Sequence, residues 1–261
     1  MSEIVDKAVS KVPAVTLGFW IIKIFATTLG ETGGDALSMT LDLGYAVSSL
    51  IFAAIFIVAV LAQVRAKAFH PFVYWLTIVA TTTLGTTMAD FADRSLGIGY
   101  TGGSALLLVL LLASLGIWRK AMGTVSVDSI TTPRAEMYYW GTILFSQTLG
   151  TALGDWMADT NDFGYENGAI VFGSALAVVA ALYFFTKANR VFLFWAAFIL
   201  TRPLGATLGD LLDKPLEHGG MNIGRFTASA VLAGLMIAMI VLLPNKAGEH
   251  PGGKTTGSPA E

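Results

Sequence analysis

The chain has 261 residues, of which 54% are hydrophobic and 13% are charged, with a formal net charge of −2 and a mean hydropathy of +0.67. A soluble domain carries about 25% charged residues, so this composition excludes an ordinary soluble protein. The sequence contains no cysteine, which excludes disulfides, thiolate metal sites, iron–sulfur clusters and cysteine nucleophiles.

Apolar segments long enough to cross a membrane alternate with short polar segments along the chain. Four of them contain no charged residue: 45–61, 105–117, 169–185 and 226–243. Each is close to the length of about 20 residues that crosses a bilayer core. None of the three histidines, His70, His218 and His250, lies within an apolar stretch, which argues against haem ligation inside the membrane.

One pattern recurs four times: a Trp, a Leu-Gly pair whose Gly lies ten residues later, and an Asp five residues after that Gly. The Trp residues are Trp20, Trp75, Trp140 and Trp195, the Gly residues are Gly30, Gly85, Gly150 and Gly205, and the Asp residues are Asp35, Asp90, Asp155 and Asp210. Ten residues after each Asp, a second helix is expected to open at Tyr45, Tyr100, Tyr165 and Gly220. Chance similarity of apolar helices does not align these landmarks four times, so the pattern indicates an internal repeat.

The repeat predicts an all-α protein, a polytopic transmembrane bundle of eight helices built as four parallel helical-hairpin repeats. The Trp spacings of 55, 65 and 55 residues divide the chain into two halves of two repeats each. The predicted helices cover residues 13–37, 44–65, 71–93, 100–118, 135–159, 165–186, 190–212 and 221–243. The predicted divisions are a cytoplasmic N-terminal segment 1–12, a first membrane half 13–120, a cytoplasmic linker 121–134, a second membrane half 135–243 and a disordered tail 244–261.

Basic residues indicate the orientation of the repeats. Because each repeat crosses the membrane twice, all four enter from the same side. The connections between repeats carry more Lys and Arg than the loops within them, where only Arg94, Lys214 and Arg225 occur. We expect a multi-pass protein of the inner membrane. By the positive-inside rule, both of its termini are expected in the cytoplasm.

Each odd-numbered helix carries one polar stripe, at positions 7, 11 and 15 after its Trp. These positions share one helix face because they are four residues apart. The stripes hold Thr27, Glu31 and Asp35, then Thr82, Thr86 and Asp90, then Gln147, Thr151 and Asp155, and finally Arg202, Ala206 and Asp210. Further carboxylates follow within a turn in the last three repeats, at Asp93, Asp159 and Asp213.

The stripes predict a cation site inside the membrane. A buried ionised carboxylate costs several kcal/mol in lipid, so the stripes are expected to face the bundle interior or a water-filled cavity. Asp35, Asp90, Asp155, Asp210 and Glu31 are then the predicted ligands of a hard cation or a proton. The predicted path is lined by Thr27, Thr82, Thr86, Gln147, Thr151, Asp93, Asp159 and Asp213, and the predicted internal counter-charges are Arg202 and Lys23. No cofactor is predicted other than a bound divalent cation.

Simpler interpretations exist for several of these residues. The outermost acids would be solvated caps of the loops, Lys23 would extend to the membrane interface, and Glu31 and Arg202 would form a structural ion pair. Small residues four apart, such as Gly30 and Gly34, indicate close helix packing. The four Trp residues and Tyr45, Tyr100 and Tyr165 are predicted to form aromatic belts at the two interfaces. Residues 159–164 are predicted to form an acidic turn rather than a calcium loop.

The fourfold pattern of Trp, Leu-Gly and Gly/Ala-Asp resembles a family of bacterial multi-spanning membrane proteins built from a hairpin repeat of unknown function. The resemblance covers roughly residues 12–243. It implies a membrane protein and brings no activity with it.

The leading hypothesis is a secondary transporter or carrier of a cation, either a divalent metal or coupled to protons, and not an enzyme. Because the sequence lacks a Walker A motif, transport is expected to be secondary or passive. One alternative is a Mg²⁺-dependent intramembrane enzyme acting on a lipid or prenyl diphosphate, suggested by Asp90-x-x-Asp93 and Asp210-x-x-Asp213. Another is a structural or accessory membrane protein. The expected partners are the lipid bilayer, a small cation and a further copy of the chain; the scattered basic residues argue against nucleic acid.

Overall fold

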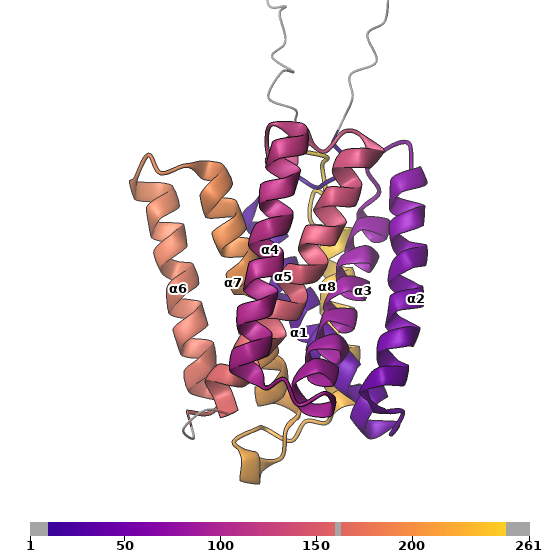
Figure 1. The fold of residues 1–261 in the computed structure, drawn as a ribbon, viewed down its shortest axis with the longest axis vertical. Coiled ribbons are helices and arrows are strands. Elements are labelled where there is room, and N and C mark those ends of the chain that lie inside the picture. Colours follow the sequence, from indigo (N-terminus) through magenta and orange to yellow (C-terminus); the bar gives the residue numbers. More distant parts are fainter. Residues whose placement is uncertain (1–9, 160–162, 249–261) are drawn as a thin grey trace, which may run out of the picture.

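The computed structural model describes residues 10–159 and 163–248. These residues form eight α-helices, which confirms the predicted all-α fold (Figure 1). The helices are α1 (Leu17–Asp35), α2 (Gly44–Arg65), α3 (Pro71–Asp90), α4 (Tyr100–Met122), α5 (Pro133–Asp159), α6 (Tyr165–Phe185), α7 (Arg190–Asp213) and α8 (Arg225–Leu242). Two π-helical turns, η1 (Ala36–Thr40) and η2 (Phe91–Ser95), extend α1 and α3.

The helices form an inner ring and an outer layer. The first helix of each repeat, α1, α3, α5 and α7, packs against two neighbours of the same kind, and together they close a ring. Of the outer helices, α2 packs on α3, α4 on α5, α6 on α7, and α8 on α1. Each outer helix therefore packs mainly on the inner helix of the following repeat, and α8 returns to the first repeat and closes the circle. The repeat is a unit of sequence, whereas the packing joins different repeats.

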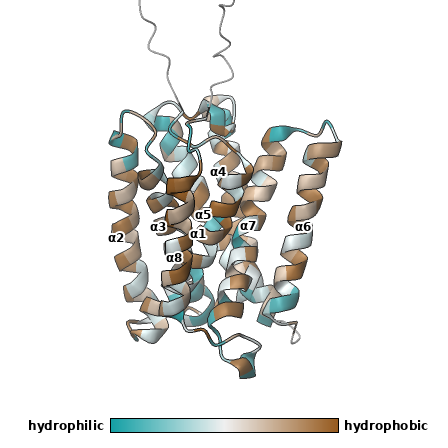
Figure 2. Ribbon diagram, turned by 180° about the vertical axis from the view of Figure 1, so that it is seen from behind, coloured by the Kyte–Doolittle hydropathy of each residue, from teal (hydrophilic) through white to brown (hydrophobic). Residues whose placement is uncertain are grey.

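Six of the helices are long and apolar enough to cross a membrane: α2, α3 with η2, α4, α6, α7 and α8. The other two, α1 and α5, belong to the inner ring and carry acidic and basic side chains such as Lys23, Glu31 and Asp155. The outer helices expose large apolar side chains, such as Leu50 and Leu112, as expected for contact with lipid. Figure 2 shows this hydrophobic surface along α2 and α6.

A glycine with positive φ precedes or opens each outer helix. These are Gly44, Gly99, Gly164 and Gly224, with φ of 72°, 76°, 77° and 85°. A side chain at such a φ is strained, which explains the glycine. Gly224 corrects the prediction that the last helix opens at Gly220. The fourth repeat has a longer loop, which contains the short 3₁₀ turn η4 (Leu216–His218) and places Lys214 and Arg225 at its two ends.

The predicted belt of Trp residues is wrong, because three of the four indoles lie in the core. Trp75, Trp140 and Trp195 are 1%, 2% and 5% exposed. They pack among Phe19, Tyr74, Tyr139 and other aromatic side chains. The reason is geometric: seven residues make about two helical turns, so each Trp faces the same way as position 7 of its polar stripe. The general preference of indoles for membrane interfaces had predicted an interfacial belt instead.

Chain segments from both ends of the protein close one end of the bundle, which we call the terminal end (top of Figure 1). Pro13 pairs with Ala247 in an isolated β-bridge, and Gly248 N–H donates to the carbonyl of Val12. Lys11 Nζ lies 2.7 Å from Glu136 Oε1 at the start of α5. Thus residues 244–248 of the predicted tail pack on residues 12–14. Residues 1–9 and 249–261, and residues 160–162 of the predicted acidic turn, lie outside the described residues.

Candidate functional site

The polar stripes of the four inner helices all face the interior of the ring. Every one of their twelve side chains is buried, with exposures from 0% to 4%. Proceeding from the terminal end, position 7 holds Thr27, Thr82, Gln147 and Arg202, position 11 holds Glu31, Thr86, Thr151 and Ala206, and position 15 holds the four Asp residues. We call the opposite end of the bundle, where the Asp residues lie, the acidic end.

The same packing contact recurs between each pair of neighbouring repeats and brings the polar stripes together. The glycine at position 10 of each inner helix lies against the position-7 side chain of the next repeat. A Cβ atom added at Gly30, Gly85, Gly150 or Gly205 would lie 2.3, 3.0, 2.2 or 2.2 Å from Thr82, Gln147, Arg202 or Thr27, respectively. These glycines therefore let the helices approach closely enough for polar side chains to meet inside the ring. The last of the four contacts joins repeat 4 to repeat 1.

Arg202 connects all four inner helices. Its Nη2 atom lies 2.8 Å from Glu31 Oε2 on α1, and it donates hydrogen bonds of 2.6 Å to Thr86 Oγ1 on α3 and 2.5 Å to Thr151 Oγ1 on α5. The side chain is 0% exposed. Because its partners occupy position 11, one turn nearer the acidic end, the guanidinium fills the interior between positions 7 and 11. Glu31 balances its charge directly.

The four Asp residues divide into two pairs, each joined by a basic side chain. Lys214 Nζ lies 2.6 Å from Asp35 Oδ2 and 3.0 Å from Asp210 Oδ1. Arg94 Nε lies 3.2 Å from Asp90 Oδ1, and its Nη2 lies 3.3 Å from Asp155 Oδ2. Each pair is made of neighbours in the ring, with α7 next to α1 and α3 next to α5. The acidic end therefore has two halves.

The additional carboxylates of the predicted path do not share one environment. Asp213 is buried and lies 3.3 Å from Arg225 Nε, which also lies 3.6 Å from Asp35. Asp159 is exposed and accepts a 2.8 Å hydrogen bond from Tyr100 OH. Asp93 is half-buried in η2. Only Asp213 of these three joins the buried cluster.

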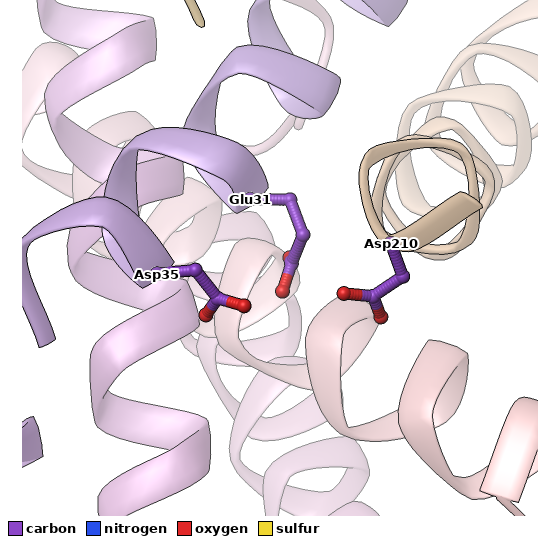
Figure 3. A group of neighbouring side chains, drawn as sticks. All are labelled: Glu31, Asp35 and Asp210. Carbon is purple, nitrogen blue, oxygen red and sulfur yellow. The ribbon is translucent and has the colours of Figure 1, made fainter. Parts of the chain in front are cut away.

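Three carboxyl groups come close enough together to share one cation. Oxygen atoms of Glu31, Asp35 and Asp210 all lie within 4.8 Å of one another. Figure 3 shows the three side chains pointing toward one another from α1 and α7. Lys214 already contacts two of them. The predicted ligands Asp90 and Asp155 belong to the other half of the acidic end, with Arg94.

Lys23 lies away from the carboxylates it was predicted to balance. Its ammonium group donates a 3.3 Å hydrogen bond to Thr201 Oγ1 and lies 4.0 Å from the centre of the Phe198 ring. The residue is 0% exposed, so it does not extend to the membrane interface. Among the described residues, no carboxylate lies within ion-pair distance of it.

The three side chains that neutralise the Asp residues were not among those predicted for the site. Arg94, Lys214 and Arg225 were used only to judge the orientation of the chain. Two of them carried a usable signal, because Arg94 and Lys214 follow Asp90 and Asp210 by four residues, the spacing at which side chains meet on a helix. Burial acts to lower the pKa of Lys214, but Asp210, Asp35 and Asp213 outweigh it and raise the pKa well above its ordinary value. Lys214 is therefore a permanent cation at this site.

Comparison with protein families accounts for the repeat. The family described as a Repeat of Unknown Function (DUF347) matches four times, at residues 18–69, 73–124, 138–189 and 193–243. Comparison with curated proteins and with solved structures gave no match. The four matches follow the four repeats of inner and outer helix, and together they cover most of the chain. The chain therefore belongs to the DUF347 repeat family of multi-spanning membrane proteins.

Proposed function

We propose that the protein is a carrier for a small cation, which binds among the carboxylates at the acidic end. The charge of the cluster supports this proposal. Its six buried carboxyl groups are Glu31, Asp35, Asp90, Asp155, Asp210 and Asp213, and the four basic side chains that contact them are Arg94, Arg202, Lys214 and Arg225. If all are ionised, these six acidic and four basic groups carry a net charge of −2. Buried charges need a partner or a proton, so the cluster favours cations.

The group of Glu31, Asp35 and Asp210 is the best place for the cation. Its three carboxylates offer only oxygen ligands, which suit hard cations such as Mg²⁺, Ca²⁺, Mn²⁺ or a proton. Lys214 Nζ lies 2.6 Å and 3.0 Å from two of them and so occupies part of the space where a cation would bind. We infer that a bound cation displaces Lys214. The lysine lies just after the end of α7, at the start of the longer fourth loop, where such a movement requires no helix to unfold.

The contacts of Arg202 favour a carrier over an open pore. A cation that passed along the interior from Asp35 would meet a fully buried guanidinium bonded to α1, α3 and α5. Passage therefore requires these bonds to break, which couples transport to a rearrangement of the inner ring. We place the protein in the inner membrane, with the acidic end on the outer side and both termini on the cytoplasmic side, following the distribution of Lys and Arg.

The structure gives the enzyme alternative less support. A diphosphate-binding enzyme needs basic side chains available to the substrate. Arg94, Lys214 and Arg225 lie at the acidic end, but each contacts at least one buried carboxylate. An accessory role would not require the six buried carboxylates of this cluster.

Flux through proteoliposomes tests the proposal. Purified protein would be reconstituted, and uptake of protons, Na⁺, Mg²⁺, Ca²⁺ and Mn²⁺ measured with trapped indicators. We expect flux of at least one cation, and we expect Asp35→Asn and Asp210→Asn to reduce it on the order of tenfold or more, since each 1.4 kcal/mol of lost affinity is tenfold. The matched control is Asp42→Asn, an exposed position with φ of 55° that Asn also adopts. Equal flux in all three variants would rule out the proposed site.

A further inference from the structure

A second group of polar side chains, which includes the stem of Arg202, lies in the ring interior nearer the terminal end than the carboxylates. Three of its members have buried polar atoms without a hydrogen-bond partner among the described residues: Thr82 Oγ1, both amide atoms of Gln147, and Arg202 Nε. All three residues are 0% exposed. Buried polar atoms are almost always satisfied in native proteins, so a group of unsatisfied ones indicates something that binds there.

These atoms belong to side chains of one layer of the ring interior, the layer of position 7. Thr86 and Thr151 both accept hydrogen bonds from Arg202 Nη2, and they follow Thr82 and Gln147 by one helical turn. Thr82 and Gln147 therefore lie one turn nearer the terminal end than the guanidinium. The stem of Arg202 passes against Gly150, three residues after Gln147 on the same helix. The Nε atom and the two side chains thus belong to the same layer of the ring interior.

Lys23 borders this region from the terminal side. It precedes Thr27, the remaining residue at position 7, by one turn, and Thr27 Oγ1 donates to the Lys23 carbonyl. The ammonium makes one hydrogen bond, to Thr201, out of three that it can donate. The carboxylate of the cluster nearest to Lys23 on α1 is Glu31, eight residues and about 12 Å away along the axis, and it pairs with Arg202. The acidic cluster is therefore too far away to neutralise this lysine.

The unsatisfied hydrogen-bond donors and the positive charge of Lys23 indicate the kind of ligand that would bind here. Arg202 Nε, the Gln147 amide nitrogen and the Lys23 ammonium are donors only, the Thr82 hydroxyl can donate or accept, and Gln147 Oε1 can only accept. Glu31 neutralises Arg202, so Lys23 provides the excess positive charge. A fully buried lysine without a carboxylate needs a counter-ion if it is to keep its proton.

We propose that Lys23, Thr82, Gln147 and Arg202 Nε form a binding site for one small monovalent inorganic anion, of the size of a halide or nitrate, near the middle of the membrane. The site goes beyond the proposed cation carriage and does not depend on it, because none of the carboxylates contributes to it. An anion here neutralises Lys23 and satisfies the unpaired donors. It also places opposite ions on the two sides of Arg202.

The test measures the unfolding temperature of the full-length protein in detergent at constant ionic strength. Bromide, nitrate or chloride would replace gluconate, which is too large to enter the site. We expect a saturable rise in the unfolding temperature with the small anions, because a ligand that binds only the folded state stabilises it. We expect Lys23→Met and Gln147→Leu to lose this rise, and Asp35→Asn, which affects only the cation site, to keep it.

Gln147→Glu provides a second test that does not depend on loss of stability. Its carboxylate would take the place of the anion beside Lys23. We expect this variant in gluconate to be as stable as the unaltered protein in bromide, and to gain nothing from bromide. The proposal is overturned if the unaltered protein responds equally to all four anions, or if Lys23→Met and Gln147→Leu keep the full response. The region would then be filled by water beside a neutral lysine.

Discussion

Arg202 and Glu31 form an ion pair of 2.8 Å between α7 and α1, with both side chains at most 3% exposed. The pair joins the last repeat to the first, and it is made by the two charged residues of positions 7 and 11. Hydrogen bonds from the same guanidinium to Thr86 and Thr151 connect this pair to the other two repeats. The asymmetry of the sequence thus produces one central contact that holds a pseudo-fourfold ring together.

Breaking this pair is expected to destabilise the protein strongly. Removing one partner of a buried ion pair leaves an uncompensated charge and costs about 3–5 kcal/mol. We therefore expect Arg202→Met and Glu31→Gln each to lower the free energy of unfolding by that order. The double variant is expected to recover most of the loss, because neither charge then remains. Chemical unfolding in mixed micelles measures all four proteins, and additive losses in the double variant would contradict the pairing.

Close packing at the position-10 glycines gives a second prediction. A methyl group at Gly150 would lie 2.2 Å from Arg202 Cγ, and overpacking of this kind costs about 1–3 kcal/mol. We expect Gly150→Ala to destabilise the bundle and to weaken the bonds of Arg202. Gly141→Ala on the same helix is the matched control, since nothing lies within 4 Å of the added methyl group and alanine favours a helix. Equal stability of the two variants would show that the inner helices are not packed as described.

Lys214 provides a prediction about competition with the cation. If it occupies part of the cation site, Lys214→Met removes a competitor and adds one uncompensated negative charge to the cluster. We expect this variant to be less stable than the unaltered protein without added cations, and to bind the transported cation more tightly. Lys187→Met, at an exposed position, is the control. Titration of the cation against unfolding temperature checks both effects; weaker binding in Lys214→Met would show that the lysine does not compete.

The connection between the chain ends and α5 can be tested independently of transport. Glu136 is buried and lies 2.7 Å from Lys11 Nζ, which also donates to the carbonyl of Val64. We expect Glu136→Gln to loosen residues 10–14 and 244–248 without unfolding the inner ring. Hydrogen exchange would then rise in the amides of Ala14 and Gly248, which donate to Lys246 and Val12. Unchanged exchange at these amides would mean that the ion pair does not hold the segments in place.

The sequence predicted the helices and the polar stripes because both depend on local spacing. Trp, Gly and Asp at fixed intervals define the repeat, and residues four apart share a helix face whatever surrounds them. The burial of Asp35 and Glu31 follows from the cost of exposing carboxylates to lipid. The roles of these residues as cation ligands stay predictions.

Relations between distant segments could not be predicted in the same way. Nothing in one repeat indicates that its outer helix packs on the inner helix of the next repeat, because that choice depends on how the ring closes. The positions of Arg225 and Lys214 depend on the longer fourth loop, whose glycine at 224 was not recognised. The Trp residues were placed at the interface by a general preference of indoles, although their register with the polar stripe pointed to the interior.

Direct cation binding to the purified protein tests the central claim, that the six buried carboxyl groups hold more negative charge than their four basic partners neutralise. Calorimetric titration with Mg²⁺, Ca²⁺, Mn²⁺ and Na⁺, together with proton uptake measured by a pH indicator, covers the candidate ions. We predict saturable binding of at least one of them, lost on the order of tenfold or more in Asp35→Asn with Asp210→Asn and unchanged in Asp42→Asn. Absence of any cation or proton binding that depends on Asp35 and Asp210 would contradict the account.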